Sequence, residues 1–275
     1  MNFSWICFPA RSAAVVFYFV LSSWCGSVFA FGVETLVLFG VYPIPGTPVH
    51  ENITRDAIAI LPPFYLSSGQ AVTFSDRATT EIAKSNAETD AHVFAAEVHF
   101  DEESFEDGQK RLRGLRDSIR LGVFILPDGG SIPRRNLGSA LHTIQDFYSH
   151  STWVEKGHTG TVPLWESGFI IPHAKPHDNT CFSSGPIPGA ALTSEYWNTS
   201  NLKFGSTDYY FFVGAAKCGH GRGDLCNDPA KCPGNFDMGG ELVVPAAGIN
   251  KDTTARAGYS EAARLAIEFS AVFFQ

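Results

Sequence analysis

Basic residues are scarce in this sequence, and charge of either sign is limited. Lys and Arg number 20 against 28 Asp and Glu, so the formal net charge is −8 at neutral pH. A chain with this balance offers no basic stripe for phosphate backbones, and we expect no nucleic-acid partner. With 275 residues, of which 44% are hydrophobic and 17% charged, it also lacks the composition of a disordered protein. A single folded domain with one sizeable core is expected.

A long apolar run occurs near the amino terminus. There "AAVVFYFVL" follows Arg11, and the small residues of "SSWCGSVFA" suit signal-peptidase cleavage after Ala30. We therefore expect residues 1–30 to be a signal peptide, residues 31–275 to form one mature domain that begins at Phe31, and the protein to be secreted. The alternative is an uncleaved membrane anchor, because "FGVETLVLFGVY" prolongs the apolar character.

Cysteine is also scarce, and no Cys-x-x-Cys pair occurs. Two of the six cysteines would leave with the signal peptide, and the remaining four are Cys181, Cys218, Cys226 and Cys232. In a secreted chain this even set predicts two disulfides. Of the three pairings, we favour the one in which Cys226 bonds Cys232 across "NDPAK". Cys181 and Cys218 then form the second bond. A structural zinc site at the four thiols is the alternative.

Two tripeptides match the acceptor for N-glycosylation. They are "NIT" at Asn52 and "NTS" at Asn198. Both fit the secretory route, and the protein is expected to be an extracellular glycoprotein.

Apolar residues recur at helical spacing in several segments. Helices are predicted within residues 47–61, within 75–126 with a break near "HFDEE", from about Pro133, and within 255–274; Ser75 is a candidate N-cap. Between about Gly157 and Asn250 the sequence is irregular, and "DYYFFV" and "ELVV" are its best strand signals. The fold class expected is mainly α, with a long irregular insertion that bears the disulfides and has few short strands.

The segment "NLGSALHTIQDFYSHSTWVE" places His142, Asp146 and His150 at four-residue intervals. Each interval advances a helix by about 40°, so the three side chains share one face. Nitrogen and oxygen donors without thiolate suit Zn²⁺ best, with Mn²⁺ and Fe²⁺ behind it. The alternative is a solvated polar stripe on an amphipathic helix, since Leu141 and Ile144 occupy the other face.

Several blocks together carry a family resemblance. "HENITRDAI", "SNAETDAH", "HFDEESFEDGQKRL", "ALHTIQDFYSHSTWVE", "KCGHG" and "GINKD" occur in order between His50 and Asp252. They resemble the fungal heterokaryon-incompatibility protein C (Het-C) family, and more closely the amino-terminal domains of animal von Willebrand factor A domain-containing protein 7. That family is distantly similar to the zinc-dependent phospholipase C and single-strand nuclease superfamily, which is mainly helical and holds three zinc ions.

The resemblance implies a set of zinc ligands in this chain. His142 and Asp146 match the His-x-x-x-Asp helix pair of the first zinc, and His99 matches its third ligand. Asp90 matches the carboxylate that bridges metals and accepts a proton from the attacking water. His50 matches the early histidine of another zinc site. Between one and three zinc ions are implied.

The second zinc site departs from the pattern of the superfamily. His150 follows Asp146 by only four residues, and the downstream His-x-x-x-Glu or His-x-x-x-Asp helix is missing. The substitutes that the sequence offers are Glu155, His173, His177 and His220, of which we include Glu155 as a candidate metal ligand.

Two functions follow from these patterns. The first is a secreted zinc-dependent phosphoesterase that hydrolyses a phospholipid or another phosphoester, with Asp90 activating water. The second is a non-catalytic extracellular recognition or scaffold domain in which metal joins helices and the partners are proteins. A lipid-associated incompatibility factor is a further alternative that the fungal resemblance raises.

Overall fold

The computed structural model describes residues 35–38, 42–45, 48–92, 95–125, 130–182, 185–196, 209–212, 215–219, 249–252, 254 and 256–275. The expected signal peptide, Asn198, Cys226, Cys232 and the strand signal "ELVV" lie outside these residues. No described helix combines the length and the hydrophobicity that a membrane crossing needs.

Helices dominate the described structure, which confirms the predicted mainly α class. They are α2 (Val49–Ala59), α3 (Asp76–Thr89), α4 (Ala96–His99), the 3₁₀ turn η1 (Asp101–Glu103), α5 (Phe105–Ile125), α6 (Ser131–His150) and α7 (Tyr259–Phe273). The predicted break at "HFDEE" falls between α4 and α5. Ser75 caps α3 as expected, because its hydroxyl accepts from the amide of Ala78 at 3.3 Å.

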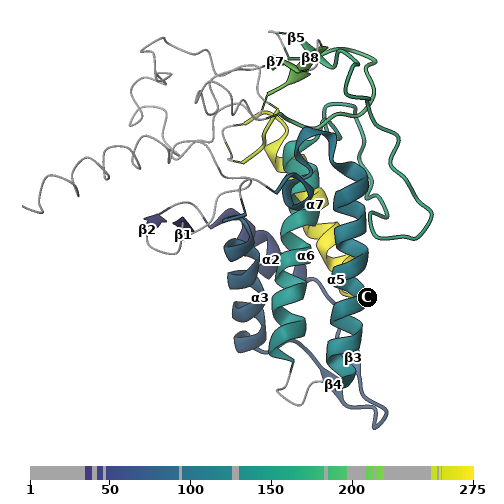
Figure 1. Ribbon diagram of the computed structural model, residues 1–275. Helices are drawn as coiled ribbons and strands as arrows, with labels where there is room; N and C mark the ends of the chain where they lie inside the picture. The colour runs from purple at the N-terminus through teal and green to yellow at the C-terminus, as the bar shows by residue number, and fades with distance from the viewer. Residues whose placement is uncertain are drawn as a thin grey trace, which may run out of the picture.

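Helix α6 is the central element of the bundle (Figure 1). It packs against α2, α3, α5 and α7, and every residue from Ala140 to His150 is buried. Gly138 permits the close approach of α3, because a Cβ at this position would lie 2.4 Å from the carbonyl oxygen of Ile82. A helix enclosed on so many sides must place its polar side chains inside the protein.

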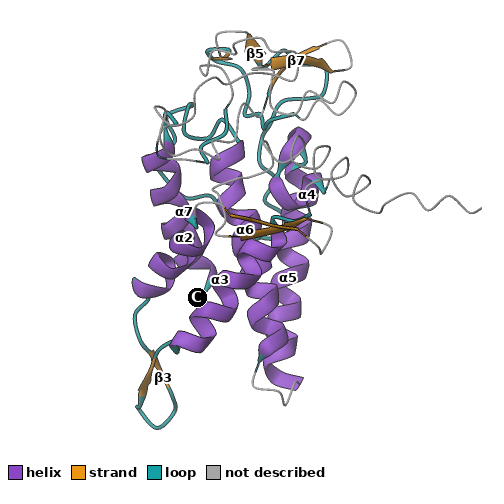
Figure 2. Ribbon diagram, turned by 90° about the vertical axis from the view of Figure 1, so that its left-hand side faces the viewer, coloured by secondary structure: helices purple, strands orange, loops and turns teal. Residues whose placement is uncertain are grey.

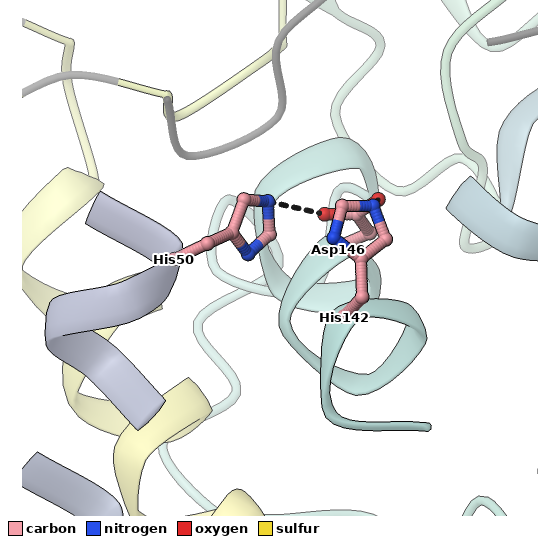
Figure 3. A group of neighbouring side chains, drawn as sticks. All are labelled: His50, His142 and Asp146. Carbon is pink, nitrogen blue, oxygen red and sulfur yellow. Dashed lines mark ion pairs between the residues drawn. The ribbon is translucent and has the colours of Figure 1, made fainter. Parts of the chain in front are cut away.

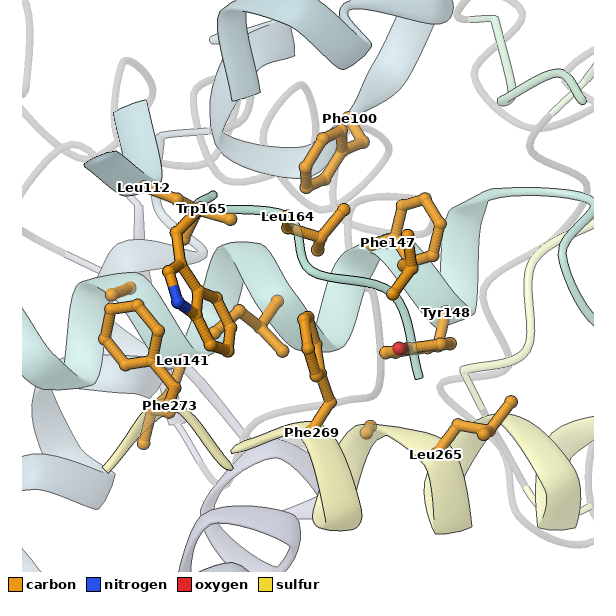
Figure 4. Packing of buried hydrophobic residues seen from close by; sticks show 14 of the residues in the cluster. Phe100, Leu112, Leu141, Phe147, Tyr148, Leu164, Trp165, Leu265, Phe269 and Phe273 are labelled. Atoms are coloured by element: carbon orange, nitrogen blue, oxygen red, sulfur yellow. The ribbon is translucent and has the colours of Figure 1, made fainter. Parts of the chain in front are cut away.

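The apolar core lies along one side of α6. Phe147 and Tyr148 pack there against Leu265 and Phe269 of α7, and Trp165 stacks on Phe269 with ring centroids 4.6 Å apart (Figure 4). Burial of large apolar side chains contributes roughly 1.5–3 kcal/mol each, so this cluster is the main stabilising element of the bundle. His142, Gln145 and Asp146 of α6 point instead toward α2, α3 and α4, where they contact His50, Asn86 and His99.

In the described part of the chain, four two-stranded antiparallel hairpins accompany the helices. They pair β1 (Thr35–Leu38) with β2 (Tyr42–Pro45), β3 (Phe64–Tyr65) with β4 (Ala71–Val72), β5 (Cys181–Phe182) with β6 (Gly185–Pro186), and β7 (Tyr209–Phe212) with β8 (Ala215–Cys218). β7 confirms the strand predicted at "DYYFFV". The last two hairpins lie beyond the end of the bundle at which α6 ends (Figures 1 and 2).

Cys181 and Cys218 form a disulfide that ties β5 to β8. This confirms one of the two favoured bonds and excludes a zinc site made of all four thiols. Asn52, the described glycosylation candidate, is exposed on α2.

Candidate metal centre

Asp146 lies at the centre of a buried group of histidines from three helices. His142 is one turn before it on α6, and its Nε2 lies 3.0 Å from Asp146 Oδ2. His99 of α4 brings Nδ1 to 2.7 Å from the same oxygen. His50 of α2 places Nε2 3.3 Å from the other oxygen, Oδ1 (Figure 3). The structure therefore brings together four of the ligands predicted from the sequence.

Side-chain amides orient two of these imidazoles. The Nδ1–H of His50 donates to Gln145 Oε1 at 2.6 Å, and that of His142 donates to Asn86 Oδ1 at 3.1 Å. Both amides are held by one hydroxyl, because Gln145 and Asn86 each donate from nitrogen to Thr54 Oγ1. With Nδ1 carrying the proton, a neutral ring turns the lone pair of Nε2 toward Asp146.

A hydrogen bond also orients His99, but here Nε2 is the donor and Nδ1 faces Asp146. Its Nε2–H donates to the backbone carbonyl of His92 at 3.3 Å, so Nδ1 presents its lone pair to Asp146. Three lone pairs thus face one carboxylate, which is a repulsive arrangement unless a cation lies among them. This is the donor pattern of a metal site whose outer hydrogen bonds fix each ring.

Asp90 completes this group from the end of α3. Its carboxylate is fully buried, and neither oxygen has a hydrogen-bond partner among the described residues. Oδ1 lies 3.8 Å from His142 Nε2, which in turn is 3.3 Å from His99 Nδ1. Donor atoms around a tetrahedral Zn²⁺ lie about 3.4 Å apart, given bonds of about 2.0–2.1 Å. Asp90, His99 and His142 therefore present donor atoms close to this spacing.

The electrostatics of the group agree with this reading. Burial lowers the pKa of His142 to about 3, so this ring is neutral, the form that binds metal. Burial also raises the pKa of Asp90 well above its usual range, and the charge of Asp146 adds to the shift.

A second group surrounds His150 at the end of α6. Its Nδ1 lies 3.0 Å from Asp101 Oδ1 and 3.2 Å from Glu195 Oε1, and its Nε2 lies 3.6 Å from Asp252 Oδ1. Ser149 donates to that oxygen of Asp252 at 2.8 Å. The side chains of this group are buried, and His99 stacks on His150 with ring centroids 6.3 Å apart, so the two groups are adjacent.

Carboxylates surround the one imidazole of the second group. Burial lowers the pKa of His150, but Glu195, Asp101 and Asp252 outweigh this effect and hold the pKa well above its usual range. The three carboxylates are themselves buried. Oxygen-rich donor sets of this kind suit a divalent cation, and Asp101, His150 and Glu195 present donor atoms within 4.8 Å of one another.

Two candidate ligands lie apart from the first group. His150 is eight residues after His142 on α6, which is about 12 Å along the helix axis. Glu155 lies outside both groups, and its carboxylate accepts from Lys251 Nζ at 2.9 Å. His92, two residues after Asp90, is exposed.

Sequence reasoning missed three members of the second group: Asp101, Glu195 and Asp252. They lie in turns and loops, so no helical period marks them. The only signal was indirect, since Asp101 and Asp252 fall inside "HFDEESFEDGQKRL" and "GINKD", two of the blocks that carry the family resemblance.

The fold and the site together define the class of domain, which is a helical bundle with a buried cluster of histidine and carboxylate side chains. The family follows from comparison with known proteins. The model of the VWA7 N-terminal domain matches residues 59–275, and the chain belongs to this family.

Curated relatives support the same assignment. The chain is 32% identical over 238 residues to von Willebrand factor A domain-containing protein 7 of Rattus norvegicus, and 31% identical to the proteins of that name from Mus musculus and Homo sapiens. Each match covers 80% of this chain but only 24% of the relative, so the chain spans about a quarter of the length of these proteins. No solved structure matches the chain.

Proposed function

We propose that this domain is a secreted zinc-dependent phosphoesterase. The observation that carries the proposal is the fully buried Asp90, which lacks a hydrogen-bond partner among the described residues and faces the donor nitrogens of His142 and His99. A carboxylate in this position is costly unless it binds a cation or exchanges a proton.

Residues of both groups have separate roles in this proposal. His50, His99, His142 and Asp146 would hold zinc in the first group, and His150 with its three carboxylates would hold a second ion. Zinc supplies a water nucleophile that is active near neutral pH and offsets negative charge on the phosphoester. Asp90 would accept the proton of that water, because its buried carboxylate faces His142 and neither oxygen has a hydrogen-bond partner among the described residues.

The substrate class rests on two considerations. Adjacent zinc ions suit phosphoester hydrolysis, in which attacking and leaving oxygens both carry charge. The resemblance to the zinc-dependent phospholipase C superfamily implies the same chemistry, with a phospholipid or another phosphoester as substrate. Residues 1–30 support secretion through their apolar run and small cleavage residues.

A scaffold domain with structural metal is the second candidate. It is favoured by burial, since the side chains of both groups are at most 5% exposed. Structural zinc sites are closed, whereas catalytic ones keep an open position. In this case the metals would tie α2, α3, α4 and α6 to the loops, and the extracellular partners would be proteins.

The experiment compares the secreted wild-type chain with Asp90→Asn. Zinc content is measured by elemental analysis, and hydrolysis is measured with bis(p-nitrophenyl) phosphate and with phosphatidylcholine vesicles. We expect bound zinc in both proteins, and a fall in kcat of about 10²–10⁴-fold in Asp90→Asn. Zinc without wild-type turnover would support the scaffold. Absence of zinc, manganese and iron after reconstitution would contradict both functions.

A further inference from the structure

The turn between α4 and α5 carries one candidate ligand of each metal group. His99 ends α4, and Asp101 follows two residues later. Phe100, Glu102 and Glu103 have positive φ values of 61°, 52° and 60°. Side chains rarely adopt this left-handed region, so contacts with other segments must hold the turn in place.

The carboxylate of Glu103 is the anchor of this turn. Lys217 Nζ donates to both of its oxygens at 2.9 Å. The hydroxyl of Thr193 donates to Oε1 and that of Tyr196 donates to Oε2, each at 2.7 Å. Four charge-assisted contacts on one buried carboxylate leave it little freedom.

The same contacts position the loop that bears Glu195. The amide of Glu102 donates to the carbonyl oxygen of Glu195 at 2.7 Å, and the amide of Glu103 donates to Ser194 Oγ at 2.7 Å. The amide of Glu195 donates in turn to the carbonyl oxygen of His150 at 3.1 Å. Asp101 and Glu195, which are 94 residues apart, therefore face His150 because these two segments are clamped together.

Lys217 reaches this clamp from the disulfide-bonded hairpin. It lies on β8 next to Cys218, is fully buried, and also donates to the carbonyl oxygen of Lys175 at 2.7 Å. The amide of Tyr196 donates to the carbonyl oxygen of Cys218 at 2.9 Å. Among the described residues, the hydrogen bonds and the ion pair of the Lys217 side chain involve no candidate metal ligand, and Glu103 is the group that links Lys217 to the turn.

We propose that Lys217 is a positioning residue for the metal ion at His150, which it serves by holding Glu103 and thereby the turn of Asp101 and the loop of Glu195. The metal part of this inference rests on the proposed function. The arrangement also assigns a role to the disulfide-bearing insertion. Lys217 of its strand β8 is the only cation among the described residues that contacts Glu103.

The test uses the full secreted chain carrying Lys217→Met. This change keeps the length of the side chain and removes its charge. We expect zinc content to fall from two ions to one, with hydrogen exchange increased at residues 100–104 and 193–196. His150→Ala removes the same ion, so combining it with Lys217→Met should cause no further loss of zinc.

Gln109→Leu is the matched control for loss of a buried polar anchor. Gln109 is buried on α5 and donates to the carbonyl oxygens of Leu164 and Phe169, with no recorded contact to a candidate ligand. It should retain both ions. An equal loss of zinc in this variant would mean that Lys217 acts only on general stability, and would overturn the proposal.

Tyr196→Phe covers the case in which Lys217→Met fails to fold. It removes one hydrogen bond to the same carboxylate, and we expect about tenfold weaker binding of the second ion. Unchanged zinc affinity in Tyr196→Phe or in folded Lys217→Met would reject the inference. If the wild type binds no zinc, the proposed function fails instead, and hydrogen exchange at residues 100–104 alone decides whether Lys217 positions the turn.

Discussion

His142→Ala tests the first candidate metal group most directly, because His142 belongs to both donor sets of this group. One set adds His50 and Asp146, and the other adds Asp90 and His99. The ring of His142 is fully buried, lies 4.3 Å from the ring of His50, and is hydrogen-bonded to Asn86. Removing a buried ring of this size costs about 3–5 kcal/mol. We therefore expect the free energy of unfolding in EDTA to fall by about 4 kcal/mol.

Zinc should add a second, separable loss. An ion present at 1,000 times its dissociation constant stabilises the folded state by about 4 kcal/mol. For a domain of this size, 1 kcal/mol corresponds to about 2–4 °C in Tm. The wild type should thus gain about 8–16 °C on addition of zinc, and His142→Ala should lose this gain together with about one equivalent of bound metal.

Leu141→Ala is the control for this measurement. Leu141 precedes His142 on α6, is equally buried, and belongs to the apolar core. Its truncation costs about 2–5 kcal/mol with and without zinc, and the zinc-induced rise in Tm should be retained. The assay is thermal unfolding in EDTA and in zinc, with elemental analysis of the same samples. A zinc-induced rise that survives in His142→Ala would refute the assignment of His142 as a ligand.

Three further predictions concern the fold and the processing of the chain. Gly138→Ala should lower the free energy of unfolding in urea by about 1–3 kcal/mol, because the new methyl group meets the backbone of α3. Gly114→Ala is the control, because open space surrounds Gly114 on α5, and it should raise the free energy of unfolding by about 0.5–1 kcal/mol. Equal effects of the two changes would contradict the close helix contact. Replacing Cys181 and Cys218 by Ala should lower the free energy of unfolding by about 4 kcal/mol, since the bond spans 37 residues; urea unfolding with no change in midpoint would count against this. Expressed in a secretory host, the protein should reach the medium with Phe31 as its first residue by amino-terminal sequencing, and an intact Met1 in the membrane fraction would exclude cleavage.

Local sequence determined the helices and part of the first candidate metal group. Periodic apolar residues fixed the helical segments, and the four-residue interval placed His142 and Asp146 on one face of α6, because helical geometry depends only on neighbouring residues. The disulfide Cys181–Cys218 belongs to the favoured one of three possible pairings of the four cysteines. Spacing alone does not say which cysteines meet. His50 and His99 came from the family resemblance, not from any period.

Only the tertiary structure decided the second candidate metal group. Asp101, Glu195 and Asp252 come from three loops separated by long stretches of chain, and they meet at His150 through contacts between segments. A turn with left-handed residues and a buried Lys217 leave no periodic mark in a sequence. The four-residue interval predicts that His142 and His150 share one face of α6, but only the tertiary structure places them in different groups, because eight residues of helix separate them by about 12 Å along the axis.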